Sequence, residues 1–218
     1  MQKLTRVFLV LGLLFLATSA GATTVQLSSH TNNGVPAELL DATYDFTVTG
    51  DQLRLAVSNL TSGANQFDIV SIFFNDSNDV ADLDLVGVQG TGEDWVFRDG
   101  GKWPSTQAFG SFDYSLHVPV WRDQNLEGVG PGDVVTFLFD ITCAGALTCD
   151  ASDFALAGSF GGPMSVFAAG RFIRGPGGAT PFGAGTTIVP VPEPATALLL
   201  GAGLIAISAR SARCARRR

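Results

Sequence analysis

The central part of this 218-residue chain has few positive charges. Between Thr23 and Pro190 we count 19 Asp and Glu against six Lys and Arg, a net charge of −13, while the other seven basic residues lie at the two ends. A domain that binds nucleic acid needs a basic surface to meet the phosphates. The composition therefore predicts no nucleic-acid partner, and favours an exported domain with a solvated acidic surface over one that collects cations.

Residues suited to catalysis are also scarce. The two histidines, His30 and His117, have no nucleophile motif beside them, and nucleophilic catalysis needs an activated nucleophile next to a base. The nearest match to a nucleophile elbow surrounds Ser159, but it has Ala157 where glycine is required and no strand-to-helix context. A carboxylate pair for glycoside hydrolysis cannot be singled out among so many acids. We expect a protein that is not an enzyme, with a polysaccharide-active enzyme as the less favoured alternative.

Between residues 23 and 190 no stretch shows a sustained helical period with caps, whereas alternation typical of strands recurs. Tyr44, Phe46 and Val48 alternate with polar residues, and Gly50-Asp51 predicts a hairpin turn to the next strand. The predicted strands are 43–49, 52–60, 67–74, 83–88, 111–118, 134–141, 154–160 and 164–173. The pattern predicts an antiparallel, jelly-roll-like β-sandwich of eight to ten strands at residues 23–174, followed by a Gly/Pro-rich linker at 175–190 that lacks a phosphate-loop signature.

Cysteine is rare as well, with three residues in the chain. Cys143 and Cys149 are six positions apart across a glycine-containing loop, which predicts a disulfide in an oxidising compartment. The chain-entropy model assigns so small a loop about 2–3 kcal/mol of stability. A metal site is less favoured, because there is no CxxC pair and no nearby histidine. Cys214 lies in the basic tail, so it is either on the reducing side of a membrane or removed.

The first 22 residues have the three parts of a secretory signal peptide. Lys3 and Arg6 precede the apolar run Val7–Ala17, which is short for a membrane-spanning helix. Ala20 and Ala22 are the small residues that a signal peptidase reads. We expect cleavage after Ala22, with a cut after Ala20 as the second choice and an uncleaved anchor as the alternative.

The last 28 residues combine a proline motif, an apolar run and a basic cluster. Val191-Pro192-Glu193-Pro194 precedes fifteen uncharged residues, 195–209. Since about 20 residues are needed to cross a bilayer core, this run predicts a marginal single transmembrane helix. The arginines that follow would stay cytoplasmic and leave the domain outside. They are Arg210, Arg213, Arg216, Arg217 and Arg218.

This arrangement resembles the PEP-CTERM protein-sorting signal of Gram-negative bacteria, which some catalogues label an ice-binding protein C-terminal domain. The resemblance covers Val191–Arg218, and no regular Thr-x-Thr ladder supports the ice-binding label. It implies recognition by an exosortase, a membrane transpeptidase-like cysteine protease that would cut near Pro192-Glu193-Pro194. Prolines on both sides of Glu193 disfavour a helix and keep this segment extended. A plain C-terminal anchor is the alternative.

An acidic segment, Phe73–Gly87, is the candidate calcium site. Calcium takes six to eight oxygen ligands, but the spacing does not match an EF-hand loop. Asp82 and Asp84 alternate with Leu83 and Leu85, which also fits the solvated face of a strand. The candidate ligands, beside Asn78, are Asp76, Asp79, Asp82 and Asp84.

Three tryptophans in loop-like segments form a candidate glycan site, because exposed aromatic rings stack on sugar faces. Tryptophans of β-sandwiches more often fill the core. The candidates are Trp95, Trp103 and Trp121, with Asp94, Arg98, Asp99, Arg122, Asp123 and Gln124 as polar neighbours.

Together these patterns predict an exported, non-enzymatic protein of the cell surface or the exopolysaccharide matrix. A carbohydrate-binding module is the alternative. The expected partners are signal peptidase, an exosortase-like protease, the membrane before processing and, for the alternative, exopolysaccharide.

Overall fold

The computed structural model describes residues 21–30, 40–62, 66–90, 94–99, 103–106, 109–119, 128–162, 165–175, 178 and 180–190. The elements in this part of the chain are β1 (Gly21–His30), β2 (Ala42–Thr49), β3 (Gln52–Asn59), β4 (Asp68–Phe74), β5 (Val80–Gln89), β6 (Val96–Arg98), β7 (Trp103–Thr106), β8 (Gly110–Phe112), β9 (Tyr114–His117), β10 (Val134–Cys143), α2 (Ala151–Ala155), β11 (Ala168–Ile173) and β12 (Phe182–Pro190).

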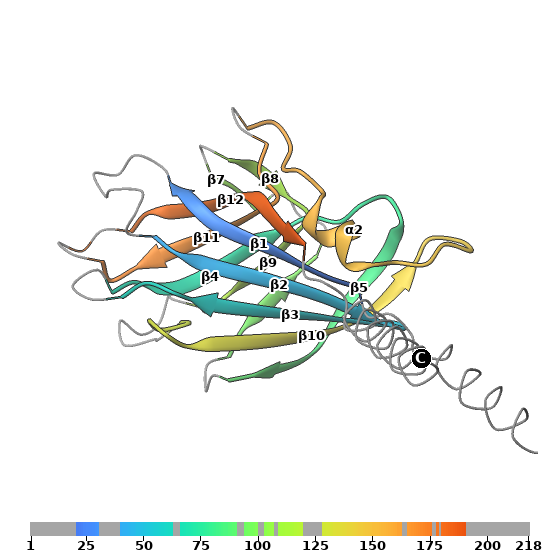
Figure 1. Ribbon diagram of the computed structural model, residues 1–218, viewed down its shortest axis with the longest axis horizontal. Coiled ribbons are helices and arrows are strands. Elements are labelled where there is room, and N and C mark those ends of the chain that lie inside the picture. Colours follow the sequence, from blue (N-terminus) through green and yellow to red (C-terminus); the bar gives the residue numbers. More distant parts are fainter. Residues whose placement is uncertain are drawn as a thin grey trace, which may run out of the picture. The chain divides into compact units, whose positions relative to one another are not determined.

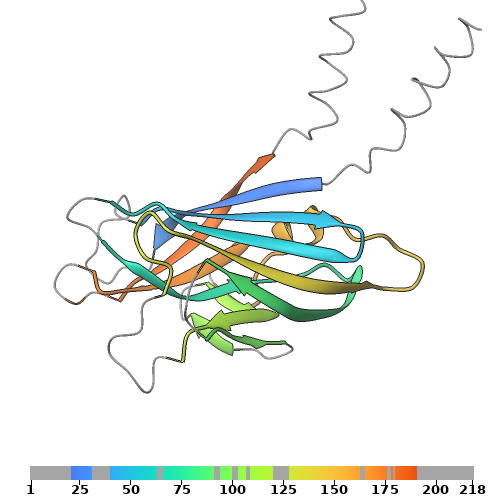
Figure 2. The ribbon, with the colours of Figure 1, turned by 90° about the horizontal axis from the view of Figure 1, so that it is seen from below.

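Ten of these strands form one antiparallel sheet in the order β5-β10-β3-β2-β1-β12-β11-β4-β9-β6, and β7 and β8 form a separate ribbon. The large sheet is nearly closed and curls over on itself (Figure 2). The predicted antiparallel all-β domain is therefore confirmed, but one continuous sheet takes the place of the two sheets of a jelly roll. The reason is the position of β12, which pairs with β1 on one side and with β11 on the other. It thereby joins the five strands from β5 to β1 with the four strands from β11 to β6 in one sheet.

The alternating pattern of β2 and β3 folds as the sequence predicts. Thr49 pairs with Gln52 across the two-residue loop, and Gly50 has the positive φ of 59° that such a turn requires. The alternate side chains Tyr44, Phe46 and Leu55 are fully buried. The two-residue period therefore places one face of this hairpin in the core.

Aromatic rings from distant strands meet inside the curled sheet. Phe74 of β4 lies 5.8 Å from Phe46 of β2 and 6.0 Å from Phe139 of β10, measured between ring centroids. Phe97 of β6 lies 5.2 Å from Phe139, so the two ends of the sheet share one core. A second cluster, around Phe73 and Phe112, packs on the other face of β4, and all seven residues of β4 are buried.

The predicted strand 154–160 is wrong. Its first residues belong to α2, which begins after Asp150 with a capping box: Asp150 accepts a hydrogen bond from the Ser152 N–H, and Asp153 accepts one from the Asp150 N–H. Phe154 stacks on Phe46, with ring centroids 6.4 Å apart. A local polar cap therefore outweighs the apolar run that suggested a strand.

The predicted linker 175–190 is also wrong, because most of it is β12. Its glycines supply space for buried neighbours: an added Cβ at Gly183 would lie 2.8 Å from Phe172 Cε2, and one at Gly185 would overlap Val25 Cγ1. These glycines are present because neighbouring strands pack closely against them. Composition alone cannot distinguish such glycines from those of a flexible linker. The β domain therefore extends to Pro190.

The predicted disulfide between Cys143 and Cys149 is present, with Cα atoms 5.8 Å apart. It joins the end of β10 to the residue before the cap of α2. The bond thus closes the segment that carries the short helix onto the sheet.

Candidate functional site

Strand β12 has two halves with different surroundings. Residues 182–185 pair with Arg171–Ala168 of β11, and the Gly185 carbonyl accepts a hydrogen bond from the Phe167 N–H at 2.9 Å. Gly183, Ala184 and Gly185 are buried. We call this segment the closed half of β12.

Residues 186–190 form the open half of β12. They pair with residues 26–23 of β1, from Thr187 opposite Gln26 to Pro190 opposite Thr23, and β11 pairs no further than Gly185. Thr186, Thr187 and Val189 are exposed, the last with 47% of its surface accessible. Within the described residues, the backbone of the open half therefore has a partner strand on one side only.

A β-bulge marks the boundary between the halves. Leu27 pairs with Gly185 and the preceding Gln26 pairs with Thr187, so β12 has one extra residue, Thr186, at this point. A bulge bends and twists its strand, and this one lies where the pairing with β11 ends.

The first and last strands along the described chain, β1 and β12, pair with each other and so bring the two ends of the domain together. β1 starts at Gly21 and Pro190 lies opposite Thr23, and Figure 1 shows β1 and β12 as neighbours. Gly21 and Ala22, assigned to the signal peptide from sequence, pair with Val48 and Thr47 of β2. The predicted cut after Ala22 therefore lies within β1, and the predicted cut after Ala20 lies directly before its first residue in sequence.

The predicted sorting and processing residues lie outside the described residues, as do Ala20, the apolar run 195–209 and the five terminal arginines. In the part of the chain that is described, no helix is long and apolar enough to span a bilayer.

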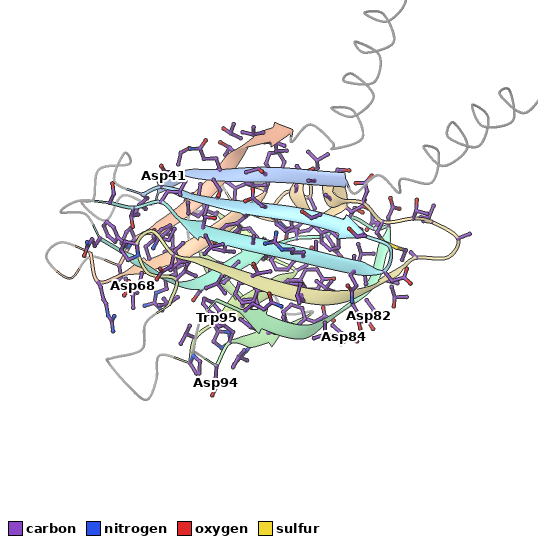
Figure 3. All side chains as sticks on the ribbon, turned by 60° about the horizontal axis from the view of Figure 1, so that its bottom comes forward. Asp41, Asp68, Asp82, Asp84, Asp94 and Trp95 are labelled. Atoms are coloured by element: carbon purple, nitrogen blue, oxygen red, sulfur yellow. A yellow bond between two sulfur atoms is a disulfide. The ribbon has the colours of Figure 1, made fainter. Side chains whose placement is uncertain are left out.

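The four candidate calcium ligands do not come together. Figure 3 shows Asp82 and Asp84 on β5, whereas Asp76 precedes the turn at Ser77–Asp79. No group of three or more His, Cys, Asp or Glu able to hold a metal occurs among the described residues. Asp84 lies opposite Asp140 of β10 in the sheet register and is exposed, so the alternation with Leu83 and Leu85 reflects the solvated face of a strand.

Asp76 has a structural partner instead. The Tyr114 hydroxyl donates a 2.7 Å hydrogen bond to Asp76 Oδ2. Burial raises the pKa of the Asp76 carboxyl, the bond from Tyr114 opposes this, and the charges of Asp113 and Asp99 raise the pKa further. Burial and the bond to Asp76 also raise the pKa of Tyr114. The pair ties the β4–β5 turn to β9.

The glycan candidates are divided by the structure. Trp95 is 8% exposed and packs edge-on against Phe137, with ring centroids 5.0 Å apart, so this ring is part of the core. Asp94, Arg98 and Asp99 are exposed, and Figure 3 shows Asp94 beside Trp95. The Trp103 side chain and the whole segment with Trp121, Arg122, Asp123 and Gln124 lie outside the described residues. The one tryptophan ring that is described offers no stacking surface.

The catalytic candidates have structural contacts. The Ser159 hydroxyl accepts a 3.2 Å hydrogen bond from the Val166 N–H. His117, in β9, has its pKa lowered by burial and by the charge of Arg98. The side chain of His30 lies outside the described residues.

Sequence reasoning missed the open half of β12. Four consecutive β-branched residues, Thr186–Val189, carry a strand signal, but the glycine-rich stretch before them suggested a linker. Sheet register was needed to show that, among the described residues, one edge of this segment has no partner strand.

Comparison with known proteins gives one family. Residues 190–218 match the model of the PEP-CTERM protein-sorting motif. No curated protein and no solved structure matches the chain. The match begins at Pro190, the last residue of β12, so the sorting motif follows the open half of β12 without an intervening linker. The chain therefore carries a PEP-CTERM sorting signal, which implies an exported protein of Gram-negative bacteria that is processed by an exosortase-like system.

Proposed function

We propose that this protein is a non-enzymatic component of the cell surface or the exopolysaccharide matrix, released to that location when an exosortase-like peptidase cuts near Pro192-Glu193-Pro194. The observation that carries the proposal is the match of residues 190–218 to the sorting motif, which begins at the last residue of the last strand of a nearly closed β sheet. In this proposal the C-terminal tail directs sorting, and the β domain is the part that reaches the final location.

The boundary of the fold supports this division. β12 ends at Pro190, so a cut at 191–194 leaves every strand of the described domain in the released product. The same cut removes the apolar run and the terminal arginines, and with them Cys214. The released chain keeps Cys143 and Cys149, which are joined to each other, and so has no unpaired cysteine.

The N-terminal end supports export in the same way. A signal peptidase cut after Ala20 would leave β1 complete, and a cut after Ala22 would remove the two residues that pair with Val48 and Thr47. Of the two predicted positions, the sheet register favours the cut after Ala20.

Mass spectrometry of the mature protein from its native host tests the proposal. We expect an N-terminus at Gly21 or Thr23 and a C-terminus within residues 191–194. A variant with Pro192→Ala, Glu193→Ala and Pro194→Ala should retain the tail, whereas the matched control Glu127→Ala, outside the motif, should be processed normally. A mature chain that still ends at Arg218 contradicts the proposal.

A further inference from the structure

We propose that the open half of β12 is a docking strand for the sorting peptidase, which pairs an extended strand of its own with residues 186–190. This inference rests on the proposed function, because it names how the processing enzyme engages the folded domain. It concerns an edge of the sheet to which no role is assigned by the sorting motif.

The first argument is the state of the backbone. Pairing of β12 with β11 ends at Gly185, and within the described chain the open half is paired only with β1. A strand with one free side offers a row of N–H and C=O groups for another strand. Recognition by strand addition uses such main-chain hydrogen bonds for affinity.

The second argument is the lack of charged side chains along this edge. Proteins usually blunt free edges with lysine, inward-pointing charges, proline, β-bulges or very short strands. The bulge at Thr186 and Pro190 lie at the two ends of the open half, and no charged residue lies between them. Thr186, Thr187, Ile188 and Val189 carry no charge, and all four are β-branched residues that favour extended backbone. Such an edge can pair with another strand through main-chain hydrogen bonds, and this pairing does not depend on attraction between charged side chains.

The third argument is continuity with the cleavage motif. Pro194 is four positions after Pro190, so a fully extended chain between them spans at most about 14 Å. An enzyme that acts at Pro192-Glu193-Pro194 must therefore work within this distance of a folded strand. Because β12 is fixed to β1 from Pro190 back to Thr187, the residues just before the motif cannot enter a deep cleft unless they leave the sheet. Pairing along the free side lets the enzyme hold this strand where it is.

The test changes the separation between the docking strand and the motif in the full-length protein in its native host. A six-residue Gly-Ser insertion between Pro190 and Val191 keeps both parts but removes their fixed register. The matched control carries the same insertion between Gly178 and Ala179, before β12, beside a glycine whose added Cβ would meet nothing within 4 Å. Conversion of precursor to processed protein is followed by pulse-chase immunoblotting.

We expect the insertion after Pro190 to slow processing roughly tenfold. With a flexible linker, an enzyme docked on the open half meets the cleavage motif at a lower effective concentration than when the two are direct neighbours. The control insertion should leave the rate unchanged. Equal rates for the two insertions would overturn the proposal, and so would faster processing after the Pro190 insertion, which would show that the domain only hinders access. If the unaltered protein is not processed at all, the proposed function itself fails, and this is visible in the same experiment.

A pair of proline variants provides a second measurement. Adjacent residues of an extended strand direct their N–H groups to opposite sides, so of Thr187→Pro and Ile188→Pro one removes a bond to β1 and the other removes a donor from the free side. The variant that keeps the melting temperature of the released domain should slow processing several-fold. Normal processing of that variant would contradict the proposal. Dimerisation of the released domain that is abolished by that variant would assign the edge to a second copy of this chain and would also overturn it.

Discussion

The two halves of β12 share one strand and one partner, β1, yet they differ in what the rest of the sheet does with them. From Gly183 to Gly185 the closed half is paired on both sides and buried, and its glycines make room for Val25 and Phe172. The open half is exposed and paired on one side. The difference teaches that this domain uses its last strand twice: the first part joins the two strand groups of the sheet, and the second part leads to the sorting motif.

The largest expected effect comes from removing the whole of β12, closed half and open half together. A chain of residues 21–181, exported to an oxidising compartment, should not fold, because without β12 the sheet separates into β5-β10-β3-β2-β1 and β11-β4-β9-β6. A chain of residues 21–190 should fold with a cooperative thermal transition. Circular dichroism of both measures this, and a cooperative transition in the shorter chain would show that β12 is not needed to join the groups.

A side chain added to the closed half should cost less than its deletion but more than one added to the open half. Gly185→Val would force a branched side chain against Val25, and overpacking of this kind costs about 3 kcal/mol. Thr187→Val, at an exposed position, should change the free energy of unfolding by less than about 0.5 kcal/mol. Urea unfolding of the two variants measures the contrast, and equal losses would mean that the halves do not differ in packing.

The neighbour of the closed half, β11, is held from the other side of the core by Tyr44. The Tyr44 hydroxyl donates a 3.0 Å hydrogen bond to the Ala169 carbonyl, and Tyr44 is fully buried. Tyr44→Phe keeps the ring and removes this donor, so we expect a loss of about 1–2 kcal/mol. Chemical denaturation provides the value, with Tyr114→Phe as a comparison at a less buried hydroxyl. An unchanged midpoint for Tyr44→Phe would show that this bond does not secure β11.

Apart from the exposed comparison variant Thr187→Val, the smallest effect is expected at the start of β1, beside the open half. Removing Gly21 and Ala22 deletes the residues that pair with Val48 and Thr47, which should lower the free energy of unfolding by about 1 kcal/mol or less. The comparison is between domains that begin at Gly21 and at Thr23, measured by thermal unfolding. A loss of unfolding free energy as large as that of Gly185→Val would show that the pairing of Gly21 and Ala22 with β2 contributes much more to stability than we expect.

Much of the fold, together with the sorting motif, could be read from linear patterns, whereas the open half of β12 could not. The alternation in β2 and β3 predicted a buried face, because strand periodicity is a local property of the chain. The spacing of Cys143 and Cys149 predicted their disulfide for the same reason: a short loop keeps the two residues close. The sorting motif at residues 190–218 is likewise read by its order along the chain.

Other predictions failed where contacts with residues distant in sequence determine the surroundings of a side chain. Trp95 has loop-like neighbours in sequence, yet its ring is buried against Phe137, which lies 42 positions away. Asp76 and Asp82 are close in sequence, yet one is bonded to Tyr114 and the other lies on the solvated face of β5. No local pattern contains these partners.

The sequence by itself determined the all-β character of the domain, the disulfide and the sorting signal, since each depends on residue types at short separations. Only the tertiary structure decided that a Gly/Pro-rich stretch is a strand of the sheet, because its glycines are required by Val25 and Phe172 and not by local flexibility. It also decided where the pairing of that strand with β11 ends. The consequence is that the sorting motif follows directly on a strand segment with a partner on one side only within the described part of the chain, where composition had predicted a flexible linker.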